Sequence, residues 1–262
     1  MRGISYLEAL VLDRTNNGAD LVKHVLGNKP KESVVKKIDA GNCIGRKALD
    51  VAMLHYDQLW DQAMWQINKD MGLGIEAVVM QGKFSYFTAP ISNTVPVRII
   101  DIPEALRALK WDGNKMITDR YREILKYNPS EAKCYKSRSF SYCTFSGSFY
   151  RRCEKDLISH SGYMCLDFDH LGGENAVADL KGRLVEDRML ETKLLFVSPS
   201  GDGLKWVVQM DVAPKDYVKM HRRCFAAYSK YIKQTYGVEV DQSGKDIARA
   251  CFIGYDEKAI AM

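Results

Sequence analysis

The fold of this chain is decided by the stretch YMCLDFD, which runs from Tyr163 to Asp169. Successive side chains of a β-strand point to opposite faces of the sheet, so Asp167 and Asp169 share one face and the alternating apolar residues share the other. Two neighbouring carboxylates repel each other and resist desolvation, and a hard divalent cation with oxygen ligands would relieve both penalties. The stretch therefore predicts an apolar strand that ends in a metal-binding pair of acids.

A third carboxylate, Asp241, ends the stretch GVEVD at residues 237–241. In a short strand the two valines of this stretch would face away from Asp241, which lets the third acid join the first pair. Taken alone, the first pair is equally compatible with two exposed acids at a strand end. An EF-hand calcium loop is excluded, because Leu171 and Ala178 stand where that loop needs oxygen ligands. Together the three acids lead to the hypothesis of a metal-dependent phosphoryl-transfer site.

Between the acidic segments lies SPSGDGLK, residues 198–205. Its Gly-Asp-Gly tip stands between two expected strands, as in a plain β-hairpin turn, and matches neither a Walker loop nor a dinucleotide fingerprint, both of which precede a helix. Lys205 alternates with Leu204 and Trp206 on the outgoing strand, so if these apolar neighbours pack under helices, Lys205 lies on the face of the aspartates. Ser200, the glycine backbone and Lys205 would then suit the binding of a triphosphate.

Four basic residues near these segments have two interpretations. Lys245 and Arg249 follow Asp241 and are either ordinary surface charges or a clamp for phosphate or a nucleic-acid template. Arg151 and Arg152 follow a segment rich in serine and aromatic residues, and the same two interpretations apply. All four are therefore candidate contacts to nucleic acid.

The composition is typical of a soluble globular protein, since 46% of the 262 residues are hydrophobic, 27% are charged and the formal net charge is +5. This basic excess is compatible with a nucleic-acid partner without requiring one. Seven cysteines without a Cys-x-x-Cys pair favour reduced thiols in the cytoplasm. The spacing of His160 and His170 from Cys153 and Cys165 fits no common zinc pattern, so no zinc site is predicted. We expect neither a signal peptide nor a membrane span.

The expected organisation is a helical region of unknown role, residues 1–75, followed by a second domain, residues 76–262. From Tyr163 onward the pattern predicts strand, helix, strand, strand, helix, strand and strand, with the long second helix over residues 216–236. The elements expected upstream are strands at 77–80, 95–100 and 144–149, a helix that begins at Asp101, and a second helix after a break at residues 112–113. Two amphipathic helices with four or five strands predict a two-layer α+β domain, with helices on one face and the aspartates on the open face.

Four motifs that occur in order resemble the VirE N-terminal-like domain family. They are Tyr142–Gly147, His160–His170, Phe196–Trp206 and Tyr236–Phe252, and the likeness extends over about residues 84–260. Because that family is common in mobile elements and phages of gut Bacteroidetes, often ahead of a helicase-like module, the resemblance implies a role in the replication of such an element.

The same order of an Asp-x-Asp strand, a Ser/Gly turn with a basic residue and an acidic strand end is similar to the archaeo-eukaryotic primase, or primase-polymerase, superfamily. The resemblance implies an RRM-like two-layer sheet in which Asp167, Asp169 and Asp241 are catalytic metal ligands for Mg²⁺ or Mn²⁺. The residues predicted to bind nucleotide are Ser198, Ser200, Gly201, Gly203, Lys205 and Arg249. Those predicted to bind nucleic acid are Arg151, Arg152 and Lys245. The superfamily usually has histidine where this chain has Lys205, and lysine is also a good phosphate partner at physiological pH.

The sequence therefore leads us to expect a cytoplasmic nucleotidyltransferase that acts on a single-stranded DNA template and nucleoside triphosphates. Two alternatives stay open. A non-catalytic module would bind single-stranded DNA through its arginines and lysines, independently of metal and of the aspartates. A metal-dependent nuclease would use the same acids to cleave DNA.

Overall fold

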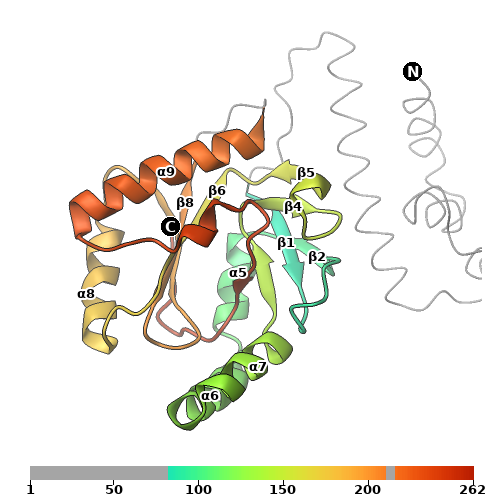
Figure 1. Cartoon of the computed structure of the whole chain (residues 1–262), viewed down its shortest axis with the longest axis vertical. Coiled ribbons are helices and arrows are strands. Elements are labelled where there is room, and N and C mark those ends of the chain that lie inside the picture. The colour runs from blue at the N-terminus through green and yellow to red at the C-terminus, as the bar shows by residue number, and fades with distance from the viewer. Residues whose placement is uncertain (1–81, 211–215) are drawn as a thin grey trace, which may run out of the picture. The chain divides into compact units, whose positions relative to one another are not determined.

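The computed structural model describes residues 82–210 and 216–262, and their arrangement is shown in Figure 1. Within these ranges the chain is a mixed α and β protein with five α-helices, and all of its strand pairings are antiparallel. The expected helical region 1–75 and the expected strand at 77–80 lie outside the described residues.

The sheet that contains the acidic stretch is called the site sheet below, and its strand order is β10-β7-β8-β6. In that order its strands are Ile260–Ala261, Thr192–Val197, Leu204–Gln209 and Tyr163–Phe168. Helices α8 (Glu174–Val185) and α9 (Tyr217–Tyr236) cover one face, where Leu166 and Trp206 are fully buried. The predicted helix-covered face is confirmed, because the alternating apolar residues of β6 and β8 belong to this core.

A second sheet lies across the other face, with the strand order β2-β1-β3-β9. In that order its strands are Arg98–Ile100, Phe84–Phe87, Tyr142–Thr144 and Cys251–Phe252. Besides two helices that are described below, the elements before β6 in the described residues are α5 (Ile102–Leu109), the two-stranded ribbon of β4 (Gly147–Phe149) and β5 (Leu157–His160), and the short 3-10 helix Glu154–Asp156. Helix α5 starts where the sequence predicted, because Asp101 and Glu104 form a reciprocal capping box at its first turn.

The prediction that the second face of the site sheet is open is wrong for most of that face. Leu194, Phe196 and Val207 point into a second core, which also contains apolar residues of β1, β3 and α5. The rings of Phe196 and Phe145, for example, lie 6.2 Å apart. The apolar side chains on this face must also leave water, so a second layer covers them. The acidic end of the sheet lies outside that core.

Helices α6 (Asp112–Tyr127) and α7 (Pro129–Ser139) form a helical hairpin. The break expected at residues 112–113 is wrong, since α6 begins there and Gly113 lies in its first turn. Helix α7 was not predicted, although Asn128 accepts a hydrogen bond from the Glu131 amide and Pro129 follows at the first helical position, which is a recognisable start signal.

The strand predicted for residues 237–241 is absent. Helix α9 ends at Gly237, which has a φ of 72°, and the following segment runs beside β6 with the Asp241 amide donating to the Asp167 carbonyl at 2.8 Å. The Asp241 side chain accepts from the Ser243 amide and so caps the 3-10 helix Gln242–Lys245, which turns the chain away from the sheet. Asp241 nevertheless lies beside Asp167 and Asp169, as expected.

A buried pair of histidines connects β5 to α9. His160 Nδ1 accepts from the Gly162 amide at 2.9 Å, His160 Nε2 lies 3.4 Å from His221 Nδ1, and His221 Nε2 lies 3.1 Å from the Gly244 carbonyl oxygen. One arrangement of neutral rings satisfies all three contacts, with each Nε2 as the donor. Burial, followed by the repulsion from His221, lowers the pKa of His160 from 6.5 to about 3. Protonation of either ring therefore destabilises the folded state relative to the unfolded state.

We expect the stability of the protein to fall as the pH decreases from about 6.5 toward 3. In this window the unfolded chain binds a proton at His160 that the folded chain does not, which removes about 1.4 kcal/mol of unfolding free energy per pH unit. Urea unfolding at pH 7 and pH 5 should give a smaller pH effect for His160→Gln than for wild type. The control is His170→Gln, because the His170 side chain is 96% exposed. If the unfolding free energy of His160→Gln changed between pH 7 and pH 5 as much as that of the wild type, the prediction would be contradicted.

Candidate functional site

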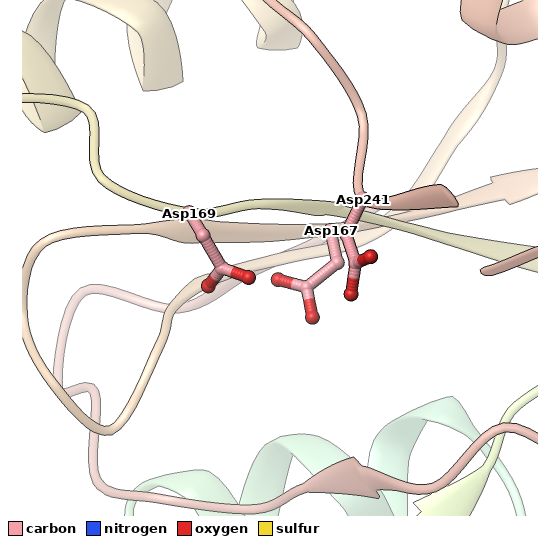
Figure 2. Close-up of side chains that lie close together, drawn as sticks. All are labelled: Asp167, Asp169 and Asp241. Carbon is pink, nitrogen blue, oxygen red and sulfur yellow. The ribbon is translucent and has the colours of Figure 1, made fainter. Parts of the chain in front are cut away.

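Three carboxylates converge at the end of the site sheet, and Figure 2 shows Asp167, Asp169 and Asp241 with their side chains directed to the same side. One oxygen from each lies within 4.8 Å of the others. Asp167 lies in β6 and Asp169 follows its last residue, so the two-residue period of the strand places both on one face. The backbone hydrogen bond from Asp241 to Asp167 brings in the third. The sequence predicted this convergence.

Asp167 forms a buried ion pair with Lys205. The two residues are register partners across β6 and β8, and Lys205 Nζ donates to Asp167 Oδ2. The Asp167 side chain is 16% exposed and that of Lys205 only 6%. Burial alone would lower the pKa of Lys205, but the neighbouring Cys251, Asp167 and Cys165 raise it above its ordinary value of 10.5. The charged form of Lys205 is therefore favoured, and the residue lies on the face that the sequence predicted.

The other oxygen of the same carboxylate, Asp167 Oδ1, is buried without a hydrogen-bond partner among the described residues. A buried unsatisfied polar group costs about 1–3 kcal/mol, and more when it is charged. Asp167, Arg249 and Cys251 line a small cavity beside it. An oxygen-seeking cation would satisfy this atom, so the acids present fit a divalent metal ion.

Asp241 is held in its ionised form. Burial alone would raise the pKa of this carboxyl, but two hydrogen bonds from Ser243 and the positive charges of Arg249 and Lys205 lower it below 3.8. Arg249 Nη2 donates to Asp241 Oδ2 at 3.2 Å, and the Arg249 side chain is half exposed. Arg249 therefore lies beside Asp241 with part of its side chain exposed to solvent, and its role in binding nucleotide stays a prediction.

Two residues that the sequence analysis did not single out interact electrostatically with the same acids. Lys136 of α7 lies above the rings of Phe252, at 5.2 Å, and Tyr121, at 6.0 Å. Burial and then the charge of Lys205 lower the pKa of Lys136, while Asp167 and Asp169 act in the opposite direction. Burial and Asp169 raise the pKa of Tyr121. Asp169 itself is exposed. Helices α6 and α7 thus bring a second lysine and a phenol to the acids.

The glycine turn between β7 and β8 is the hairpin that the sequence predicted. The Ser198 amide donates to the Gly203 carbonyl at 2.9 Å, and the hydroxyl oxygens of Ser198 and Ser200 lie 2.9 Å apart. Gly203 is required for packing, since a Cβ there would lie 2.3 Å from the Phe168 carbonyl oxygen. Gly201 has a φ of 84°, which favours glycine. Ser198 is buried, so of the two hydroxyls that of Ser200 is the more accessible.

Asp202 at the tip of the turn has a structural role that the sequence did not indicate. Its Oδ1 accepts from the Gly172 amide at 2.9 Å and the Gly173 amide at 2.7 Å. These bonds tie the turn to the loop that follows Asp169, and so fix the position of that acid.

Of the residues predicted to bind nucleic acid, Arg152 is occupied by other contacts. Its Nη2 donates to the Ile91 carbonyl at 3.5 Å and its guanidinium lies 5.2 Å from the Tyr142 ring centre. Arg152 therefore braces the segment before β2. Arg151 and Lys245 are exposed. No helix among the described residues has the length and apolar character needed to cross a membrane.

Neither the curated proteins nor the solved structures contain a match to this chain. A family model does match, over a range that begins in α7, ends in β10 and contains all three aspartates as well as Lys136. This is a Bacteroidetes family, as the sequence predicted, whereas the VirE and primase-polymerase links stay predictions. Residues 135–260 match the family described as BT4734-like, N-terminal domain.

Proposed function

We propose that this chain is a metal-dependent nucleotidyltransferase of the VirE N-terminal-like, primase-polymerase type, which acts in the DNA replication of a mobile element or phage. The observation that carries the proposal is the group of three carboxylates, whose oxygens lie within 4.8 Å of one another beside the cation of Lys205. The buried, unpartnered Oδ1 of Asp167 supports the proposal, because a positive ion would satisfy it.

The order of the elements along the chain supports an RRM-like fold for the site sheet. Strand β6, helix α8, strands β7 and β8, helix α9 and the extended segment before Asp241 follow one another as in a β-α-β-β-α-β unit. In space β6 lies between β8 and that segment, which is bonded to β6 through Asp241. An RRM-like sheet has this arrangement, although here a single backbone hydrogen bond stands in for the last strand.

The acids provide an all-oxygen ligand set, which suits Mg²⁺ or Mn²⁺. When bound, such an ion would supply the positive charge needed for in-line attack of a hydroxyl on an α-phosphate. Asp167, Asp169 and Asp241 would hold it, and the burial of Asp167 would exclude water from one side. Arg249 beside Asp241 and Ser200 in the glycine turn would orient phosphate oxygens of the substrate.

The charges around the acids favour an anionic substrate once metal is bound. Lys205, Arg249 and Lys136 are near the three carboxylates, so the positive and negative charges balance without metal. Any divalent ion then leaves the site positive, and a polyphosphate would restore neutrality. Metal and nucleotide are therefore expected to bind together.

The test is DNA synthesis by the purified chain on a single-stranded template, with deoxy- or ribonucleotides and with Mg²⁺ or Mn²⁺, and with product length read on a gel. We expect extended products that disappear with a chelator. If the protein cleaves labelled DNA in the presence of Mn²⁺ and without nucleotides, the proposal is wrong and the protein is a nuclease. If the protein binds DNA in the presence of a chelator and synthesises no DNA under any of these conditions, it is a non-catalytic binding module.

A further inference from the structure

The α6–α7 hairpin is attached to the candidate site at two points. Arg122 Nε of α6 donates to the Pro199 carbonyl at 3.0 Å, and its guanidinium lies beside Gly201 in the glycine turn. Lys136 of α7 stacks over Phe252 of β9. Figure 1 shows the two helices together at one end of the described residues. The hairpin therefore contacts both the turn and the strand next to the acids.

The contact with Phe252 also ties Lys136 to strand β9, whose other residue, Cys251, belongs to the candidate site. The neighbouring residue, Cys251, has its Sγ 3.8 Å from that of Cys165 in β6 and lines the same cavity as Asp167. The Lys136 ammonium above the Phe252 ring is therefore next to the short strand, β9, that contributes Cys251 to this cavity. Its electrostatic interactions with Asp167, Asp169 and Lys205 agree with this position.

The two lysines near the acids differ in what they contact. Lys205 donates to Asp167 and is buried, so it is engaged before any substrate binds. Lys136 contacts the faces of two aromatic rings, and no hydrogen bond or ion pair of its ammonium is found in the described part of the chain. Cation–π contacts leave the N–H donors of an ammonium available to an anion.

We infer that Lys136 contacts the polyphosphate of the incoming nucleotide, while Arg122 positions the α6–α7 hairpin against the glycine turn. This rests on the proposed function and deepens it, because the cations that the sequence assigned to the nucleotide were Lys205 and Arg249 and did not include Lys136. The ammonium of Lys136 lies on the acid side of the hairpin, where phosphate oxygens shared with a metal ion would be located. The rings of Tyr121 and Phe252 already hold the ammonium in place, so little side-chain freedom is lost on binding.

The test compares Lys136→Met with Lys133→Met, in the full chain and without template. Methionine keeps an unbranched apolar stem against Tyr121 and Phe252, whereas Lys133 is exposed on the same helix. Titration calorimetry with Mg²⁺ present would use a deoxynucleoside triphosphate and inorganic triphosphate as separate probes. Loss of a hydrogen bond to a charged group predicts about tenfold weaker binding of both probes by Lys136→Met and a change of less than about twofold in Lys133→Met.

Thermal unfolding of both variants checks that each is folded at the temperature of the titration. Wild-type affinity in Lys136→Met would overturn the inference, and so would equal losses in the two variants. Metal-dependent synthesis that survives in Lys136→Met with unchanged affinity would leave the proposed function standing without this contact. A wild-type chain that binds neither probe would overturn both proposals.

Discussion

Replacing Asp169 by asparagine is expected to abolish nucleotide incorporation by the chain while leaving its stability unchanged. The side chain of Asp169 is exposed and the neighbouring loop is fixed by Asp202, so the folded structure does not depend on the carboxylate. Loss of one metal ligand removes several kcal/mol of transition-state charge stabilisation, which corresponds to a rate decrease of roughly a thousandfold. The measurement is product formed per unit time on a primed or unprimed single-stranded template.

Asp169 is a cleaner test than Asp167, because Asp167→Asn would also leave the buried Lys205 without its partner and weaken the fold. The matched control is Asp179→Asn in α8, an exposed acid whose side chain is 70% accessible and pairs with Arg183 at the surface. Asp179→Asn should synthesise at the wild-type rate. Full activity in Asp169→Asn would show that the acids do not hold a catalytic ion.

Replacing Lys205 by methionine is expected to lower the unfolding free energy by about 3–5 kcal/mol when metal is removed by a chelator. The variant leaves the Asp167 carboxylate buried with neither oxygen paired, and removal of one partner of a buried ion pair has effects of about this size. The measurement is urea unfolding in the presence of a chelator. Lys126→Met is the control, because the pair of Lys126 with Glu123 is exposed and its loss should have no resolvable effect.

Added Mn²⁺ should restore part of the lost stability of Lys205→Met, because a cation at Asp167 would take the place of the ammonium. The rise in unfolding free energy on adding Mn²⁺ should therefore be larger in the variant than in wild type. An equal response of the two proteins would argue against a metal ion at Asp167. Unchanged stability of the variant in chelator would argue against the ion pair itself.

The period of β-strands made the acidic site predictable. Alternation in β6 placed Asp167 and Asp169 on one face, and alternation in β8 placed Lys205 on that same face with Trp206 under the helices. Both inferences need only the two-residue period and the exclusion of apolar side chains from water. The hairpin at residues 198–203 followed from its Gly-Asp-Gly tip in the same way.

Other parts of the site depend on contacts between distant segments. Asp241 was expected in a strand, yet it reaches β6 through one backbone hydrogen bond and caps a 3-10 helix with its side chain. The second face of the site sheet was expected to be open, but Phe196 and Val207 bury themselves against the second sheet. Local patterns do not reveal which partner covers an apolar face.

The sequence by itself determined the acidic strand, the face that carries Lys205 and the presence of a glycine hairpin, because each depends on residues within a few positions of one another. Only the tertiary structure decided that Lys205 neutralises Asp167, that Asp202 fixes the loop behind Asp169, and that Lys136 reaches the acids from α7. Those interactions join residues that are at least 29 positions apart in the chain. Their formation depends on how helices and sheets pack, which the alternation of side chains along one strand does not specify.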